Sequence, residues 1–216
     1  MRILLTAFEP FGGSSVNPSQ VAVQRLAAPQ PGDPPTGLPP GASLATEFLP
    51  VVGGPAADAA PARLVAAMEW QRPDVLVCVG ETGSRGSICL ERIAVNLRDY
   101  RIPDNAGVQV HDQAVVPHAP AAYFSTLPLR HMLAALQEEG IPAELSLSAG
   151  TFLCNEVMYH ALHHAPRVGC RMAGFIHVPR LPSQCAAGEP QMPLQTTLAG
   201  LRASLRALTG LAGANA

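Results

Sequence analysis

Residues 74–80, Asp-Val-Leu-Val-Cys-Val-Gly, are the stretch from which the fold class is most directly predicted. Their apolar side chains are continuous and do not alternate with polar ones, which is typical of a strand covered on both faces in a mostly parallel sheet. Further strands are predicted over 3–7, 46–52, 91–96, 145–149 and 173–178.

Helical patterns alternate with these strands. Asn17 can cap a helix whose first residue, Pro18, suits that position, and the pattern continues to Ala27. The other helices are predicted over 57–70, 129–139 with a stop at Gly140, 154–165 and 194–208. The alternation predicts a single three-layer α/β domain over residues 1–216. Residues 29–41, rich in Pro and Gly, are expected to form a surface loop, and 209–216 a flexible tail.

Length and charge exclude several classes of protein. The 216 residues are enough for a large, dry core, and the formal net charge is −2. Because no basic run is present, nucleic acid is not an expected partner. The longest apolar stretches are too short to span a membrane, so no membrane partner is expected either.

Lysine is absent, so all 14 basic residues are arginine. This excludes a phosphate-binding lysine, a lysine Schiff base and a lysine general base. The five cysteines include no Cys-x-x-Cys pair, which argues against a disulfide scaffold and a structural zinc site. Since the N-terminal apolar run is also too short for a signal peptide, we expect a cytoplasmic protein.

The segment 145–156, Leu-Ser-Leu-Ser-Ala-Gly-Thr-Phe-Leu-Cys-Asn-Glu, places Cys154 at the start of a helix, after a turn of small residues. Unpaired backbone N–H groups and the helix dipole favour a thiolate there. The same amides can face an oxyanion on an attacked carbonyl. Two interpretations stay open: Cys154 is a nucleophile, or it is a small core residue at a tight junction.

A thiolate nucleophile needs a base. His177 ends an apolar strand, where ligands gather in open α/β sheets. Glu91 is an acid among apolar residues and could orient a histidine. The alternatives are a His177 held by hydrogen bonds at a strand edge and a Glu91 paired with Arg92 or another arginine.

Two further segments carry weaker signals. Glu156, His160 and His164 have the i, i+4 spacing that can bind a metal, but no His-Glu-x-x-His motif accompanies them. We therefore expect a solvated helix face there, with no metal and no other cofactor. The glycines after residue 80 lack the Gly-x-Gly-x-x-Gly order of a nucleotide-binding loop.

Four blocks in order carry a resemblance to a known family. They are Thr-Ala-Phe-Glu-Pro-Phe-Gly-Gly at 6–13 with Asn-Pro-Ser at 17–19, Glu-Arg-Ile-Ala-Val-Asn at 91–96 with Arg-Ile-Pro-Asp-Asn at 101–105, Ser-Leu-Ser-Ala-Gly-Thr-Phe-Leu-Cys-Asn at 146–155, and Phe-Ile-His-Val-Pro at 175–179 with Leu181, Pro182 and Gln184. From about residue 4 to residue 184 the sequence resembles the type I, cysteine-dependent pyroglutamyl peptidases, also called pyrrolidone-carboxylate peptidases.

The resemblance implies an enzyme that removes an N-terminal pyroglutamyl residue from peptides through a thioester. In it, Cys154 is the nucleophile, His177 the general base and then acid, and Glu91 the residue that orients the imidazole. Arg101 falls where the family has an arginine that assists the oxyanion. The implied substrate pocket is lined by Phe8, Phe11, Asn17, Glu81 and Phe152. The resemblance also implies an α/β/α domain with an open, twisted sheet, and assembly as a homotetramer.

The sequence departs from the family at two positions near these blocks. Glu81 stands where many bacterial members carry a pocket-side glutamine, and a carboxylate pointing inward would attract a cationic N-terminus. Cys89 stands where the signature expects Ser or Thr, which adds a second thiol near Glu91. The loop 29–41 also looks longer than usual.

Two other functions are compatible with the same residues. One is an amidase of similar fold acting on free glutamine-like substrates, which a panel of pyroglutamyl and γ-glutamyl amides would separate. The other is a binding protein that keeps the pocket without turnover, which titration of the Cys154 thiolate would test.

Overall fold

The structure, a computed structural model, describes residues 1–38 and 41–208. The predicted tail, 209–216, lies outside the described residues, as do two residues of the predicted loop 29–41. The described part of that loop contains no helix or strand, as expected. In the described part of the chain, no helix is long and apolar enough to cross a membrane.

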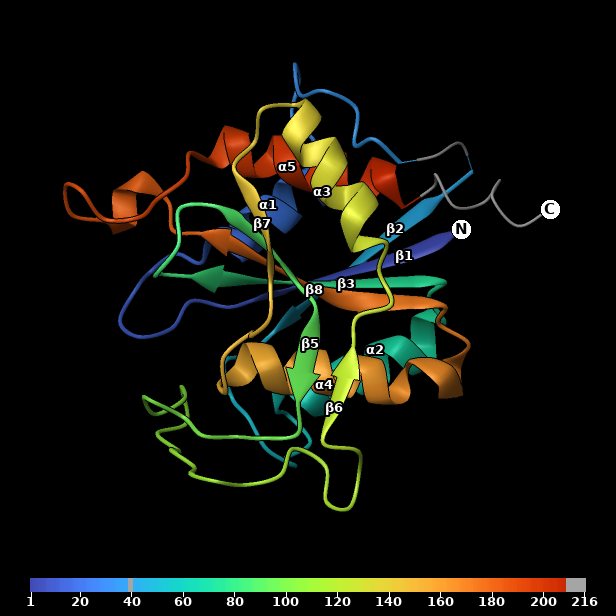
Figure 1. The fold of residues 1–216 in the computed structure, drawn as a ribbon, viewed down its shortest axis with the longest axis vertical. Helices are drawn as coiled ribbons and strands as arrows, with labels where there is room; N and C mark the ends of the chain where they lie inside the picture. Colours follow the sequence, from blue (N-terminus) through green and yellow to red (C-terminus); the bar gives the residue numbers. More distant parts are fainter. Residues whose placement is uncertain (39–40, 209–216) are drawn as a thin grey trace.

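A mostly parallel sheet forms the centre of the molecule (Figure 1). Within the described residues it has six strands in the order β2-β1-β3-β8-β4-β7. They are β1 (Arg2–Phe8), β2 (Ser43–Leu49), β3 (Val75–Thr82), β4 (Ile88–Glu91), β7 (Ala143–Ser146) and β8 (Met172–Pro179). The strands β2, β1, β3 and β8 are mutually parallel, whereas β4 runs antiparallel to β8 and parallel to β7. The predicted sheet is therefore confirmed.

Helices cover both faces of this sheet, as Figure 1 shows. On one face lie α1 (Pro18–Ala27), α3 (Leu129–Glu138) and α5 (Leu194–Ala207), and on the other α2 (Ala60–Gln71) and α4 (Leu153–Val168). A short 3-10 helix, η1 (Pro182–Gln184), follows β8. The predicted three-layer α/β/α arrangement is confirmed.

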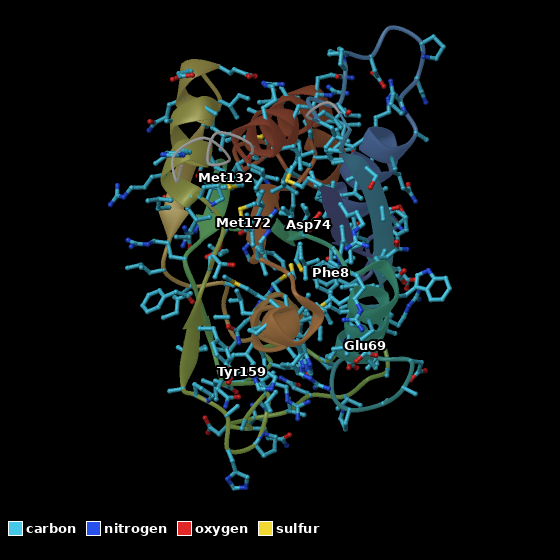
Figure 2. All side chains as sticks on the ribbon, turned by 90° about the vertical axis from the view of Figure 1, so that its right-hand side faces the viewer. Phe8, Glu69, Asp74, Met132, Tyr159 and Met172 are labelled. Carbon is cyan, nitrogen blue, oxygen red and sulfur yellow. The ribbon has the colours of Figure 1, made fainter. Side chains whose placement is uncertain are left out.

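Strand β3 shows why its sequence is continuously apolar. Val75, Val77 and Val79 belong to the core under α1, α3 and α5. Leu76 and Cys78 point the other way, into the core formed with α2 and α4. Because successive side chains of a strand point to opposite faces, a strand between two cores needs apolar residues at every position. Figure 2 shows how the side chains fill both spaces, with Phe8 and Tyr159 on the α4 side.

The prediction of one strand over residues 91–96 was wrong. Strand β4 ends at Glu91, and Arg92 is exposed at the break. Strand β5 (Ile93–Val95) then pairs antiparallel with β6 (Ala122–Phe124), a short strand that was not predicted, in a separate two-stranded sheet. Glu91 is thus the last residue of a strand in the central sheet.

Strand β7 also ends earlier than expected, at Ser146, and residues 147–152 form a loop that leads into α4. The Ser146 hydroxyl accepts a hydrogen bond from the Ser148 backbone N–H. Just after the last strand residue, a serine side chain thus provides the hydrogen-bond acceptor that a neighbouring strand would otherwise provide. The other predicted helices and strands are found with ends shifted by a few residues. The predicted Asn17 cap is confirmed, because its side chain accepts a hydrogen bond from the Ser19 N–H.

Candidate functional site

One cavity of about 620 Å³ lies where the ends of β3, β4 and β8 meet the start of α4. Cys154, His177 and Glu91 all line it. The cavity is also lined by four other residues implied by the resemblance, Phe11, Glu81, Arg101 and Phe152. Residues from the two ends of the chain are thus brought to the place where strand ends and a helix N-terminus converge, as expected of a ligand site in an open α/β sheet.

His177 and Glu91 form a buried hydrogen-bonded pair. The Nδ1–H of His177 donates to Oε1 of Glu91 over 2.8 Å, and both side chains are buried. The pairing of β4 with β8 explains this contact, because Glu91 is opposite Phe175 and His177 is two residues further along the same face. The Glu91 carboxylate can therefore fix the orientation of the imidazole ring.

His177 also contacts the thiol. Burial disfavours a charged imidazole, but Cys154 and Glu91, through charge and hydrogen bonding, outweigh burial and raise the pKa of His177 from 6.5 to about 9. At neutral pH this environment favours the protonated imidazolium beside the Cys154 sulfur. A positive charge in this position favours the thiolate form of a cysteine, which is its nucleophilic form.

Gly80 leaves room for this pair. A Cβ atom added at Gly80 would lie 2.6 Å from Cζ of Phe175 and 3.0 Å from Sγ of Cys154. Gly80 is opposite His177 in the pairing of β3 with β8, so the backbone of β3 passes directly beside the thiol. Any side chain at this position would displace the sulfur or the Phe175 ring, whose centroid is 4.8 Å from that of His177.

The N-terminus of α4 leaves backbone donors beside Cys154. The helix begins at Leu153, and its N-cap residue, Phe152, makes no side-chain capping hydrogen bond. The first N–H groups of a helix have no partner within the helix. They can therefore face negative charge that develops on a carbonyl attacked by Cys154. Arg101, exposed and without a side-chain hydrogen bond or ion pair among the described residues, lines the same cavity.

Asn155 is a site residue for which the sequence predicted no role. Its side chain is buried and bonds the backbone of the β5 region: Oδ1 accepts from the Val95 N–H at 2.9 Å, and Nδ2 donates to the carbonyl oxygens of Val95 and Leu97. These bonds attach the chain that leads to Arg101 to the helix that begins beside Cys154. The only signal in the sequence was its position directly after the cysteine.

Two of the predicted pocket residues lie behind the cavity and do not line it. Phe8 is buried in the core, with its ring centroid 6.4 Å from that of Phe175. Asn17 is fully buried, and besides capping α1 it donates from Nδ2 to the Glu9 carbonyl oxygen. Through the Glu9 carbonyl oxygen, Asn17 supports the turn that carries Phe11, whose ring centroid is 6.4 Å from that of Phe152.

The expectation of a solvated face on α4 was wrong. Glu156 is buried, accepts hydrogen bonds from the Tyr100 hydroxyl and from the Gly54 N–H, and lies 3.6 Å from the Arg98 guanidinium. Burial first, and the Glu156 carboxylate second, raise the pKa of Tyr100 far above its usual value. His160 is half-buried, and burial lowers its pKa to about 4. Among the described residues, no three His, Cys, Asp or Glu side chains are grouped to hold a metal ion.

Cys89, the second thiol near the site, lines the cavity but differs from Cys154. It is buried, and its thiol donates to the Ser87 carbonyl oxygen. Burial raises its pKa to about 11, so Cys89 is a protonated, weakly reactive thiol at neutral pH.

The family model described as pyroglutamyl peptidase matches residues 1–210 of the chain. The pyrrolidone-carboxylate peptidase of Gloeobacter violaceus is 46% identical over 210 residues, which cover 96% of this chain and 97% of that protein. The pyrrolidone-carboxylate peptidase of Levilactobacillus brevis is 40% identical over 211 residues, with 96% and 97% covered.

Solved structures agree with these relatives. A mutant pyrrolidone carboxyl peptidase from the hyperthermophile Pyrococcus furiosus superposes with a TM-score of 0.86 at 40% identity, covering 96% of this chain and 98% of that chain. The pyroglutamyl peptidase I of Bacillus amyloliquefaciens superposes with a TM-score of 0.85 at 36% identity, covering 96% of each chain.

Proposed function

The chain belongs to the pyroglutamyl peptidase family and is a cysteine peptidase of that type, and we propose that Cys154, His177 and Glu91 are its catalytic triad. Its substrates are accordingly peptides with an N-terminal pyroglutamyl residue. The observation that carries the proposal is the buried hydrogen bond from His177 to Glu91 in the cavity that also contains the Cys154 thiol.

In the first half of the reaction, the Cys154 thiolate attacks the carbonyl carbon of the pyroglutamyl residue. The oxyanion that forms is stabilised by the free N–H groups at the start of α4, with help from Arg101. When the C–N bond breaks, the His177 imidazolium gives its proton to the leaving nitrogen. The shortened peptide departs, and a thioester joins the pyroglutamyl group to Cys154.

In the second half, the neutral His177 takes a proton from water, and the resulting hydroxide attacks the thioester carbonyl. The C–S bond breaks, which releases pyroglutamate and restores the thiolate beside an imidazolium. The carboxylate of Glu91 stabilises the imidazolium and holds the ring in one orientation throughout. Glu91 accepts a hydrogen bond and is not itself required to take a proton.

Specificity follows from the chemistry of the substrate terminus. A pyroglutamyl residue ends in a neutral lactam, whereas an ordinary peptide ends in an α-ammonium group. A partly apolar pocket between Phe11 and Phe152 accepts the lactam, while desolvating a charged ammonium group there is costly. Two hydrogen-bonding groups of the lactam ring, one N–H and one C=O, can be satisfied by the polar groups of the cavity wall.

The triad is tested by replacing the nucleophile. Cys154→Ala should abolish cleavage of a fluorogenic pyroglutamyl reporter while the circular dichroism spectrum stays that of the folded protein. Cys185→Ala, which removes a free cysteine outside this cavity, is the matched control and should keep full activity. Turnover by the Cys154→Ala variant would refute the proposed nucleophile.

Three expected features stay predictions. The residues predict activity without a metal or other cofactor and a cytoplasmic location, and the resemblance implies assembly as a homotetramer. Dialysis against EDTA, which should leave activity unchanged, tests the first feature. Fractionation of cells that express the chain tests the second, and analytical ultracentrifugation tests the third.

A further inference from the structure

An acidic side chain lies in the wall of the candidate active site. Glu81 follows Gly80 on β3, lines the same cavity as Cys154 and His177, and its side chain is 5% exposed. A buried carboxylate is strongly disfavoured unless it is paired and hydrogen-bonded. Unpaired, it would also attract a cationic group into a pocket that must accept a neutral lactam.

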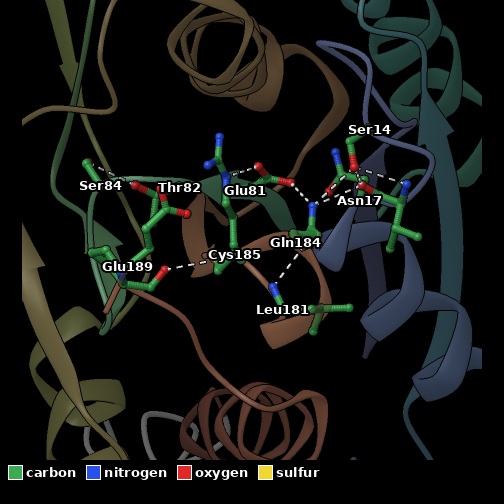
Figure 3. A network of polar contacts seen from close by, with 12 residues as sticks. Ser14, Asn17, Glu81, Thr82, Ser84, Leu181, Gln184, Cys185 and Glu189 are labelled. Carbon is green, nitrogen blue, oxygen red and sulfur yellow. Dashed lines mark hydrogen bonds and ion pairs between the residues drawn. The ribbon is translucent and has the colours of Figure 1, made fainter. Parts of the chain in front are cut away.

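Both oxygens of this carboxylate are engaged (Figure 3). Oε1 accepts a hydrogen bond from Nε of Arg180 at 3.0 Å, and Oε2 accepts one from Nε2 of Gln184 at 3.2 Å. Gln184 is itself fixed, because its Oε1 accepts from the Leu181 N–H and its Nε2 also donates to the Val16 carbonyl oxygen. Both oxygens of Glu81 therefore already accept hydrogen bonds from the protein itself.

Arg180 lies just beyond the end of β8 and contacts the backbone of the loop after β3. It directly follows Pro179, the last residue of the strand that carries His177. A Cβ atom added at Gly83 would lie 2.8 Å from Cζ and 2.9 Å from Nε of Arg180. The guanidinium group thus packs against the backbone at Gly83, where a side chain would displace it, and it lines the cavity beside Glu81.

We propose that Arg180 determines the specificity of this cavity by neutralising Glu81, so that this part of the wall carries no net charge and the cavity selects a neutral lactam over a cationic N-terminus. This inference rests on the proposed function. Arg180 acts through Glu81 and is a specificity-determining residue, not a member of the triad. The charge of Glu81 is tolerated at this position because Arg180 compensates for it.

Two five-membered rings of similar size differ in charge and so distinguish the two kinds of terminus. The nitrogen of 2-pyrrolidone is a neutral amide, whereas the nitrogen of pyrrolidine is a cation at neutral pH. A wall in which Glu81 is paired with Arg180 offers the cation no net attraction to offset its lost hydration. Without the guanidinium charge, the Glu81 carboxylate attracts the cation at short range in a medium of low dielectric constant.

The test measures competitive inhibition of pyroglutamyl reporter cleavage by 2-pyrrolidone and by pyrrolidine. The wild-type protein should bind 2-pyrrolidone much more tightly. Arg180→Gln keeps a hydrogen-bond donor for Glu81 but removes the charge, and it should reduce this preference about tenfold or more, mainly through tighter binding of pyrrolidine. Arg180→Lys keeps the charge and should retain the preference. The double variant Glu81→Gln with Arg180→Gln, which carries neither charge, should restore it.

An unchanged ratio of the two inhibition constants in Arg180→Gln would overturn the proposal. So would a reduced ratio that the double variant does not restore, because the lost preference would then not depend on the charge of Glu81. Failure of the proposed function would look different: the wild-type protein would not cleave the pyroglutamyl reporter, or Cys154→Ala would still cleave it.

Discussion

His177 donates a hydrogen bond from Nδ1 to Oε1 of Glu91 over 2.8 Å, although 86 positions separate the two residues in the chain. The contact exists because β4 runs antiparallel to β8 in an otherwise mostly parallel sheet. The same arrangement leaves the imidazole next to Cys154 at the start of α4. The antiparallel direction of β4 thus brings the Glu91 carboxylate to the His177 imidazole, which in turn lies beside the Cys154 thiol.

Glu91→Gln should lower kcat about 10²-fold or more and leave KM nearly unchanged. The glutamine can still accept a hydrogen bond from His177, but it cannot stabilise an imidazolium by charge. Steady-state kinetics with a pyroglutamyl reporter measure both constants. An effect confined to KM would show that Glu91 contributes to substrate binding and not to orientation of the base.

The activity should fall as the pH rises through about 9, the raised pKa of His177. Above that pH the imidazole has lost the proton it gives to the leaving nitrogen. Because the folded pKa exceeds the value of 6.5 for a free imidazole, the pair also stabilises the fold below 6.5, and this contribution is lost as the pH rises through about 9.

Cys154→Ala should lower the pKa of His177, since Cys154 is the largest of the influences that raise it. NMR titration of the imidazole in the wild-type protein and in the variant measures the change. Denaturant unfolding across the same pH range should show a smaller loss of stability in the variant. An identical titration of His177 in the two proteins would contradict the thiolate–imidazolium pair.

Gly80→Ala should reduce activity at least tenfold, because the new methyl group would lie 3.0 Å from Sγ of Cys154 and closer still to the Phe175 ring. Gly86→Ala is the matched control, as a Cβ atom there meets only Pro190 at 3.9 Å, an ordinary van der Waals contact. Reporter kinetics and thermal melts of both variants provide the comparison. Full activity in Gly80→Ala would contradict the close approach of β3 to the thiol.

Tyr100→Phe should destabilise the fold by about 1–3 kcal/mol, because Oε2 of the buried Glu156 loses its hydrogen-bond donor. Arg63→Gln, which removes a partly exposed ion pair with Glu47, should cost at most about 1 kcal/mol. Urea unfolding of both variants measures these changes. Equal effects of the two substitutions would show that the Tyr100–Glu156 contact is not a structural link between its loop and α4.

The central strand and the layers could be predicted because their signals are local. The unbroken apolar run of β3 requires cover on both faces, and Asn17 with Pro18 marks the start of α1. The division between β4 and β5 could not be predicted in this way. It depends on pairing with β8 and β6, which lie far away in the sequence. Arg92, the residue at the break, gives no signal of its own, because charged residues also occur within edge strands.

The candidate site divides in the same manner. Cys154 and His177 stood out because each lies at the end of an element where chemistry is expected. Glu156 did not, since its burial depends on Tyr100 and Arg98, which belong to a loop more than fifty residues away. Arg180 likewise gained a role only when its contact with Glu81 was known, because the two residues are 99 positions apart.

The central claim is that Cys154 becomes acylated during turnover. Because the chain contains no lysine, trypsin cleaves only after arginine, and the peptide 131–167 contains Cys154 as its sole cysteine. The most direct measurement is mass spectrometry of this peptide after acid quenching of the enzyme during turnover of an activated pyroglutamyl ester. We predict a pyroglutamyl group on peptide 131–167 in the wild-type protein and none in Cys154→Ala. A pyroglutamyl group on another peptide, or turnover without any acylation of 131–167, would contradict the account.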